Sequence, residues 1–380
     1  MVNKSMSIKI IDLFCGAGGF AEGFLSTRHN FKLVYALDID KWASETARKN
    51  HPNTRVDNSD IRKIDPKKIS REIKENSVDL IIGGPPCQGF SSLRPNRASN
   101  LNDSRNSLFS NFANFIEVFR PKIFVMENVV GLATHDNGRT LQIIEETFTS
   151  LNYLVDWKIL NAASYGVPQK RERLIMIGTR DNEKVGFPKP QFNFSGKVIG
   201  HKDKNRILLA PNLDKVKSAL TVNDAISDLP RLSRGQYQDE YKLPPQNKYQ
   251  KQRRGKSNSL TLHKAANHSD KMLEIIKHAG DSISSIPAGL ITSGFSSCYS
   301  RLNGDAPSTT ITVKFQSPAS SKCIHPKQHR TITPREAARI QSFNDDYVFM
   351  GPLTHVASQI GNAVPPLLGK AIGNHLGRYL

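Results

Sequence analysis

The sequence predicts an α/β fold in which a doubly wound, mostly parallel sheet is joined to a second, smaller and irregular domain. Over the first 180 or so residues, short apolar runs typical of strands alternate with segments of helical spacing. Beyond Asp181 the alternation gives way to a stretch rich in Pro, Ser, Asn, Lys and Arg, and ordered patterns return near Arg330. We therefore expect a sheet domain over residues 1–186, an irregular domain over 187–330, and a segment 331–380 that completes the sheet domain.

The individual elements follow from periodicity and from capping residues. Strands are expected at residues 9–14, 32–37, 54–56, 78–82, 121–126, 154–160, 173–178 and 308–313. Helices are expected at residues 41–50, 108–119 and 141–151, and a further helix follows the glycine turn and ends near residue 25. Thr333, Pro334 and Glu336 form a helix start with an N-cap, a first-turn proline and a capping-box acid. A last helix is expected to open at residues 359–366 and to run through Leu380.

The charge balance points to a polyanionic partner. The 380 residues hold 53 Lys and Arg against 34 Asp and Glu, a net charge of +19. No apolar run approaches the ~20 residues of a membrane span, and the N-terminus has no signal-peptide core, so we expect a cytoplasmic protein without a membrane partner. The four cysteines form no Cys-x-x-Cys pair, which indicates neither a zinc site nor a disulfide framework, and no metal is expected.

A glycine-rich turn after the first strand predicts a nucleotide-binding loop. The turn contains Gly16, Gly18 and Gly19 and leads into a helix. Asp38 ends the second strand about 20 residues further on, where an acid typically binds ribose hydroxyls. This pattern also fits a loose dinucleotide fingerprint, so an NAD site is an alternative at this point.

Three strand ends offer a thiol, a carboxyl and a guanidinium. Cys87 lies on the stiff loop Gly84-Pro85-Pro86-Cys87, directly after a buried strand. A free cysteine can simply be a small buried apolar residue. Glu127 at another strand end, together with Arg173 or Arg171, makes a catalytic thiol the better interpretation, because the three groups suit covalent addition to an electrophilic ring. Residues 91–103 are long for a connection and are expected to form a mobile active-site loop.

Six segments in order resemble the motifs of the DNA (cytosine-5) methyltransferases, in particular those of prokaryotic restriction-modification type. They are residues 12–20, 84–91, 127–129, 169–173, 330–336 and 361–366, and the resemblance covers nearly the whole chain. The departures are mild, such as Ile332 where leucine is usual. The resemblance implies a Rossmann-like methyltransferase fold, with target recognition by residues 187–330 and S-adenosylmethionine as the cofactor.

The family pattern implies a role for each cofactor residue. Phe14 would pack on the adenine, Asp38 would hold the ribose, and Asp60 would take the adenine amino group. Ile39 and Ile61 would sandwich the ring. The other residues expected at this site are Gly16, Ala17, Gly18, Gly19, Pro86, Leu108 and Asn362.

The resemblance also implies the reaction and its partners. Cys87 would add to C6 of a flipped-out cytosine, Glu127 would bind N3, and Arg173 would bind O2 with support from Arg171. The substrate would be double-stranded DNA. A monomer is expected, with a cognate restriction endonuclease acting on the same site without a stable complex.

Two alternatives belong to other classes of protein. An RNA cytosine-5 methyltransferase would share the catalytic core, but the Cys-Phe-Thr signature of its tRNA-modifying members is absent here and the variable region is longer. A catalytically silent DNA-binding relative would not need Cys87, Glu127 and Arg173 together. The basic run at 248–256 is either a solvated loop or part of the DNA-binding surface.

Overall fold

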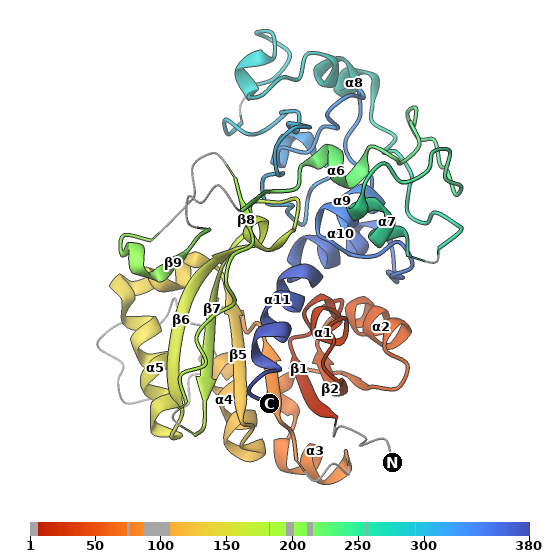
Figure 1. Cartoon of the computed structure of the whole chain (residues 1–380). Coiled ribbons are helices and arrows are strands. Elements are labelled where there is room, and N and C mark those ends of the chain that lie inside the picture. Colours follow the sequence, from red (N-terminus) through yellow and green to blue (C-terminus); the bar gives the residue numbers. More distant parts are fainter. Residues whose placement is uncertain are drawn as a thin grey trace.

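The computed structural model describes residues 7–73, 77–86, 107–181, 183–194, 201–210, 216–255, 257–292 and 294–380. An eight-stranded sheet forms one part of the molecule, and a lobe of helices and irregular chain extends from one end of its strands (Figure 1). The strand order is β3-β2-β1-β4-β5-β7-β6-β9. Among these strands β7 alone runs antiparallel to its neighbours, so the expected doubly wound, mostly parallel sheet is confirmed.

The strands lie close to their expected positions. They are β1 (Ile8–Leu13), β2 (Phe31–Asp38), β3 (Arg55–Asn58), β4 (Leu80–Gly83), β5 (Ile123–Asn128), β6 (Leu154–Asn161), β7 (Glu172–Thr179) and β9 (Ile207–Leu208). A separate two-residue pair joins β8 (Phe192–Asn193) to β10 (Lys217–Ser218). The short edge strands β3 and β9 carry weak sequence signals, because few of their residues are buried.

The α-helices divide between the sheet and the lobe. Those nearest the sheet are α1 (Gly19–Leu25), α2 (Lys41–Asn50), α3 (Pro66–Glu72), α4 (Ser107–Phe119), α5 (Arg139–Ser150) and α11 (Pro366–Leu376). Those of the lobe are α6 (Val222–Ile226), α7 (Lys248–Arg254), α8 (Asp270–Lys277), α9 (Pro334–Ile340) and α10 (Leu353–Asn362). Thr333 accepts from the Glu336 amide while Glu336 accepts from the Thr333 amide, which confirms the expected capping box of α9.

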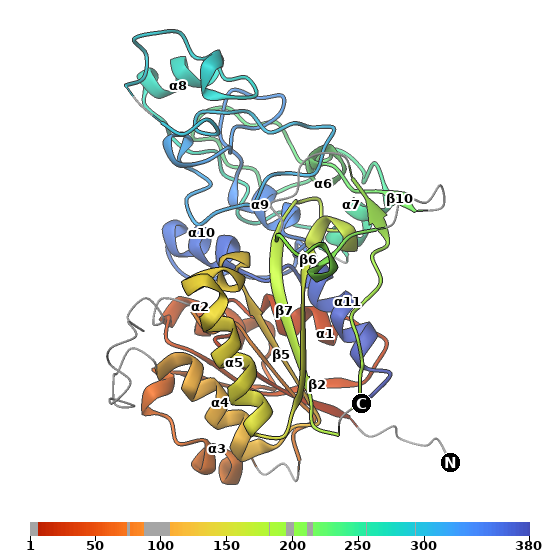
Figure 2. The same cartoon turned by 90° about the vertical axis from the view of Figure 1, so that its left-hand side faces the viewer.

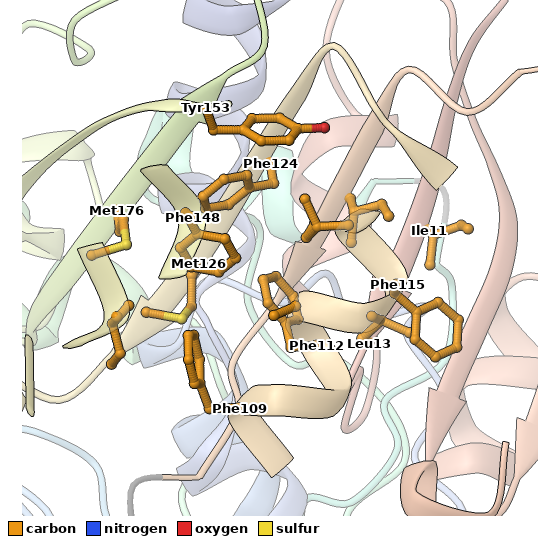
Figure 3. Packing of buried hydrophobic residues seen from close by; sticks show 14 of the residues in the cluster. Ile11, Leu13, Phe109, Phe112, Phe115, Phe124, Met126, Phe148, Tyr153 and Met176 are labelled. Atoms are coloured by element: carbon orange, nitrogen blue, oxygen red, sulfur yellow. The ribbon is translucent and has the colours of Figure 1, made fainter. Parts of the chain in front are cut away.

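Two apolar cores cover the two faces of the sheet. Alternate residues of β1 separate onto these faces, with Ile11 in one core and Ile10 in the other. The first core is aromatic, and in Figure 3 the Phe112 ring of α4 and the Phe148 ring of α5 pack on Phe124 of β5, with the Phe124–Phe148 centroids 4.2 Å apart. The second core contains apolar residues of α1 and α11.

The C-terminal helix α11 approaches α1 at closely packed glycines. A Cβ atom at Gly23 would lie 2.4 Å from the Pro366 carbonyl oxygen and 2.6 Å from the Lys370 amide nitrogen. Glycine is required at Gly23 because the two backbones are nearly in contact there. The last 15 residues thus return to the helix that follows the first strand, although they are far away in sequence.

Most of the lobe shares one core with α9 and α10. Val222, Ile226 and Tyr249 pack in the same cluster as Ala337 and Ile340. A smaller apolar cluster around Ile275 and Ile276 of α8 forms the far end of the lobe (Figures 1 and 2). The core around α6, α7 and α9 therefore contains residues from both sides of the expected boundary at residue 330.

Two local expectations were wrong, and one of two open alternatives is excluded. The segment 308–313 is not a strand, because it makes only an isolated bridge from Ser308 to Gln169, and the Ile311 amide and carbonyl oxygen bond to the side chains of Gln169 and Arg171. The last helix does not open at residue 359, since 359–362 end α10 and α11 begins at Pro366. The basic run is not a solvated loop, because Lys248–Arg254 form α7 and bury Tyr249, Gln250 and Arg253.

Candidate active site

The candidate active site lies at the carboxyl ends of five adjacent parallel strands. Chain order along the sheet reverses between β1 and β4, since β2 and β3 lie on one side of β1 while β4 and β5 lie on the other. Ligands of open α/β sheets bind at this kind of switch point. A cavity of about 770 Å³ is lined there by residues that follow β1, β2, β3 and β4 and by the end of β5.

Most of the residues named from the sequence meet in this cavity. Its lining includes Phe14, Gly16, Asp38, Ile39, Asp60, Ile61, Pro86, Leu108, Glu127, Arg171, Arg173 and Asn362. Cys87 and residues 91–103 lie outside the described residues. Pro86, the residue before Cys87, is at the cavity wall.

Ala17, Gly18 and Gly19 do not line the cavity. They form the turn into α1 and face the C-terminal part of the chain instead. Ala17 is buried, and a Cβ atom at Gly19 would lie 2.6 Å from the Val364 carbonyl oxygen. The φ of Gly18 is 81°, in the left-handed region that glycine readily adopts. Of the three glycines of the turn, only Gly16 lines the cavity.

Glu127 and Arg173 form an ion pair at the cavity wall. The Arg173 Nε atom lies 2.7 Å from Glu127 Oε1, and both side chains are largely buried. A Cβ atom at Gly84 would lie 3.0 Å from Glu127 Oε2, so the glycine before the two prolines leaves room for this carboxylate. The side-chain amide of Asn128 donates from Nδ2 to the Pro85 carbonyl oxygen at 2.9 Å, which connects the end of β5 to the loop after β4.

The Asp38 carboxylate holds the glycine loop in place. Its Oδ2 atom accepts from the Gly16 amide at 2.7 Å, and its Oδ1 atom accepts from the Asp40 amide at 2.8 Å. Burial raises the pKa of Asp38, and these two backbone donors act against that rise. Asp38 therefore shapes the loop after β1 as well as lining the cavity.

Asp60 is paired with a neighbour that the sequence did not single out. The Arg62 side chain donates to both carboxylate oxygens of Asp60, each at 2.9 Å from Nε. This hydrogen bonding lowers the pKa of Asp60. Arg62 also lines the cavity.

The Arg171 guanidinium is buried in the cavity wall and bridges two distant segments. It donates to the carbonyl oxygens of Ile311 at 3.3 Å and Gly361 at 2.9 Å. Its Nε atom has no hydrogen-bond partner within the described part of the chain. Burial, and then the neighbouring guanidinium of Arg173, lower the pKa of Arg171 well below its usual range.

Asp12 is a functional candidate that sequence reasoning missed. It lines the cavity and is only 1% exposed, and within the described residues its Oδ2 atom has no hydrogen-bond partner. Burial, and then the charge of Asp38, raise the pKa of Asp12 well above its usual range. A buried acid in the apolar strand β1, two residues before Phe14, was the available signal. His355 of α10 also lines the cavity, but its helix was not expected.

Neither a metal cluster nor a membrane-spanning helix is found in the described part of the chain. No group of three or more His, Cys, Asp or Glu side chains is arranged there to hold a metal ion. No helix there is long and apolar enough to cross a bilayer.

The family model for C-5 cytosine-specific DNA methylases matches residues 8–378. The chain belongs to this family. Methyl transfer to C5 of cytosine in DNA, with S-adenosylmethionine as methyl donor, is the activity of the C-5 cytosine-specific DNA methylases. The expected enzyme class is thereby confirmed, and the NAD alternative was wrong.

Relatives and solved structures agree with this membership. The chain is 38% identical over 372 residues to the Type II methyltransferase M1.HphI of Haemophilus parahaemolyticus, covering 97% of this chain and 86% of that protein. It is 37% identical over 399 residues to the Type II methyltransferase M.DdeI of Desulfomicrobium norvegicum, and the match covers 98% of this chain and 89% of that protein. A crystal structure from E. coli, described as a prophage-encoded DNA modification methyltransferase, is 25% identical with a TM-score of 0.74, covering 97% of this chain and 98% of that chain.

A more distant structure shows the fold alone. The DNMT2 structure of Spodoptera frugiperda is 16% identical with a TM-score of 0.61 and covers 95% of this chain and 97% of that chain. The Rossmann-like methyltransferase fold expected from the sequence is thus confirmed.

Proposed function

We propose that this protein methylates C5 of one cytosine within a specific double-stranded DNA sequence, as the methylase of a Type II restriction-modification system. Two relatives of similar length that are named Type II methyltransferases support the proposal. The net charge of +19 suits a phosphate backbone. We propose a cytoplasmic monomer that shares its site with a restriction endonuclease and forms no stable complex with it.

The single observation that carries the catalytic assignment is the Glu127–Arg173 ion pair, 2.7 Å between Oε1 and Nε, at the wall of the strand-end cavity. A carboxyl and a guanidinium side by side can face N3 and O2 of one pyrimidine ring. The Arg173 guanidinium would stabilise negative charge that moves onto O2 when a nucleophile adds at C6, and Glu127 would do so at N3 in its protonated form, by donating its proton to N3.

The residues of the cavity fit S-adenosylmethionine. Phe14, Ile39 and Ile61 line the cavity with apolar side chains, and the residue Ile39 is 66% exposed, which leaves apolar surface on which an adenine could pack. Four carboxylates line the cavity besides Glu127: Asp12, Asp38, Asp40 and Asp60. Arg62 pairs with Asp60, whereas no described arginine pairs with Asp12, Asp38 or Asp40, and these three suit a cationic ligand. The Asp12 Oδ2 atom, which has no hydrogen-bond partner among the described residues, would accept from its ammonium group.

When bound, the cofactor supplies an electrophilic methyl group. The Cys87 thiolate would form a bond to C6 of cytosine, and the electron pair of the C5=C6 bond would then be available at C5. After C5 has taken the methyl group it loses its proton to a base, the bond from sulfur to C6 breaks, and the double bond re-forms. Since C6 is covered by stacking inside a duplex, the cytosine must be flipped out.

Covalent trapping tests this proposal. Duplex DNA carrying 5-fluorocytosine at the target should form a denaturation-resistant adduct with the wild-type protein, because fluorine cannot leave C5 as a proton does. Cys87→Ser should form no adduct and have no turnover, while it still binds S-adenosylhomocysteine. A wild-type protein that forms no adduct at a confirmed target would contradict the proposal.

The target is found separately by bisulfite sequencing of a plasmid methylated by the protein. We expect methylation at one short sequence on double-stranded DNA. A tRNA incubated in parallel addresses the RNA alternative, and preferential methylation of the tRNA would refute the DNA assignment.

A further inference from the structure

Two buried glutamines connect the lobe to the cavity through a relay of hydrogen bonds. The Ile311 amide donates to Gln169 Oε1 at 2.9 Å, Gln169 Nε2 donates to Gln341 Oε1 at 2.8 Å, and Gln341 Nε2 donates to the Ile360 carbonyl oxygen at 2.6 Å. Both glutamine side chains are fully buried. All three bonds run in one direction, so neither amide can be reversed without loss of its partners.

Arg171 makes a second connection between the same segments. Its guanidinium donates to the Ile311 and Gly361 carbonyl oxygens. Gly361 itself lies against residues 312 and 313, because a Cβ atom there would be 2.5 Å from the Thr312 carbonyl carbon and 2.5 Å from the Val313 amide nitrogen. We call Gln169, Gln341 and Arg171 together the amide clasp.

The amide clasp holds together the two sides of the cavity. On one side, Arg173 follows Arg171 by two residues and pairs with Glu127. On the other side, Asn362 directly follows Gly361 at the end of α10 and lines the cavity. Ile311 lies between them, and this segment has no strand ladder of its own to fix it.

We propose that Gln169 and Gln341 are positioning residues, which set the distance between the base-binding pair and the cofactor-binding end of α10. This inference rests on the proposed function. Methyl transfer needs C5 and the methyl group in line and nearly in contact, and small displacements there are costly in rate. Neither amide lines the cavity, so both act through the backbone segments that they hold.

Gln169→Met tests the inference, because methionine keeps the length of the side chain and removes both hydrogen-bonding groups. We expect the single-turnover methylation rate to fall on the order of 10- to 100-fold. The dissociation constants for DNA and for S-adenosylhomocysteine, each measured alone, should change less than about threefold, since each half-site stays intact. A wild-type rate in this variant would overturn the proposal.

A double-mutant cycle separates positioning from general packing. If the two amides act as one relay, Gln341→Met alone should slow the reaction as Gln169→Met does, and the double variant should be little slower than either. A rate loss in the double variant equal to the product of the two single losses would mean that the glutamines act independently, and would contradict the relay. Gln169→Asn is the milder variant if methionine prevents folding. The asparagine side chain is one methylene shorter and cannot reach both partners, so the methylation rate should still fall. A wild-type rate in this variant would count against the relay.

Gln250→Met is the matched control. Gln250 is equally buried, accepts from the Gln246 amide at 2.6 Å and donates to the Ser227 hydroxyl at 2.8 Å, and it does not line the cavity. The Gln250→Met variant should have a lower melting temperature and an unchanged rate of methyl transfer. A rate loss equal to that of Gln169→Met would show that the loss of any buried amide slows the reaction, and would contradict the positioning role. The 5-fluorocytosine adduct of the wild-type protein reports on the proposed function itself, so failure of the relay and failure of that function are distinguishable.

Discussion

The Glu127 carboxylate on β5 contacts the Arg173 guanidinium on β7, 2.7 Å between Oε1 and Nε, across an antiparallel pair. The register places Glu127 opposite Ile175, so Arg173 is a diagonal neighbour on the same face. The one strand that runs against the rest of the sheet thus brings an arginine to the strand ends where the carboxylate lies. Sequence spacing did not show that β5 and β7 are neighbours.

Glu127→Gln should remove the acid that we propose faces N3, while it keeps the shape of the side chain. We expect the methylation rate to fall at least about 100-fold, as for loss of a general acid. Binding of target DNA should weaken far less, because phosphate contacts dominate it. Single-turnover assays and DNA titrations measure both quantities. A rate within a factor of two of the wild type would rule out the acid role.

Asp38→Asn should weaken cofactor binding. An amide offers one acceptor oxygen, so either the Gly16 or the Asp40 amide loses its partner. We expect the dissociation constant of S-adenosylhomocysteine, measured by calorimetry, to rise about 10-fold or more, the equivalent of one lost charge-assisted hydrogen bond. Asp65→Asn, which changes the N-cap of α3 away from the cavity, is the control and should leave the constant unchanged.

Asp228→Asn should destabilise the protein strongly. Asp228 is fully buried, and its two oxygens bind Arg339 at 2.6 Å and Arg254 at 2.8 Å. Removing one partner of a buried ion pair costs about 3–5 kcal/mol in unfolding free energy.

The exposed pair of Arg234 and Asp270 provides the control for this variant, since the Asp270 side chain is 93% exposed. Asp270→Asn should change the unfolding free energy by less than about 1 kcal/mol. Urea unfolding followed by circular dichroism measures both variants, and equal effects would contradict the importance of the buried network.

Glu22 should make the stability depend on pH. Burial and then the charge of Asp346 raise the pKa of Glu22 to about 7, against the opposing effects of Arg253 and Lys370. The folded state therefore holds this proton more tightly than the unfolded state, whose value is near 4.5, and stability falls as pH rises between them. Glu22→Gln should match the wild type at pH 4, below the unfolded value, and gain about 2 kcal/mol at pH 8, after allowance for partial exposure. A gain that is equal at both pH values would exclude this titration.

Local sequence patterns determined much of this protein. The alternation of apolar runs and helical periods gave the class of fold and nearly all strands of the main sheet, because burial on both faces demands those patterns. The capping box at Thr333 was also visible, since it depends on residues three apart. The cavity residues Asp38 and Glu127 could be named because each lies at a strand end, whereas Phe14 was named from the resemblance to the family's first motif.

Only the tertiary structure decided how distant segments meet. The place of Asp12 at the cavity depends on its burial. The bond from Arg171 to Gly361 joins residues 190 positions apart, and the contact of Asp228 with Arg339 joins residues 111 positions apart. The strand expected at 308–313 did not form, and the Ile311 amide and carbonyl oxygen bond to the side chains of Gln169 and Arg171 instead of to a neighbouring strand. Short-range periodicity contains no information on such partners, since burial and hydrogen bonding between remote segments are fixed only when the whole chain packs.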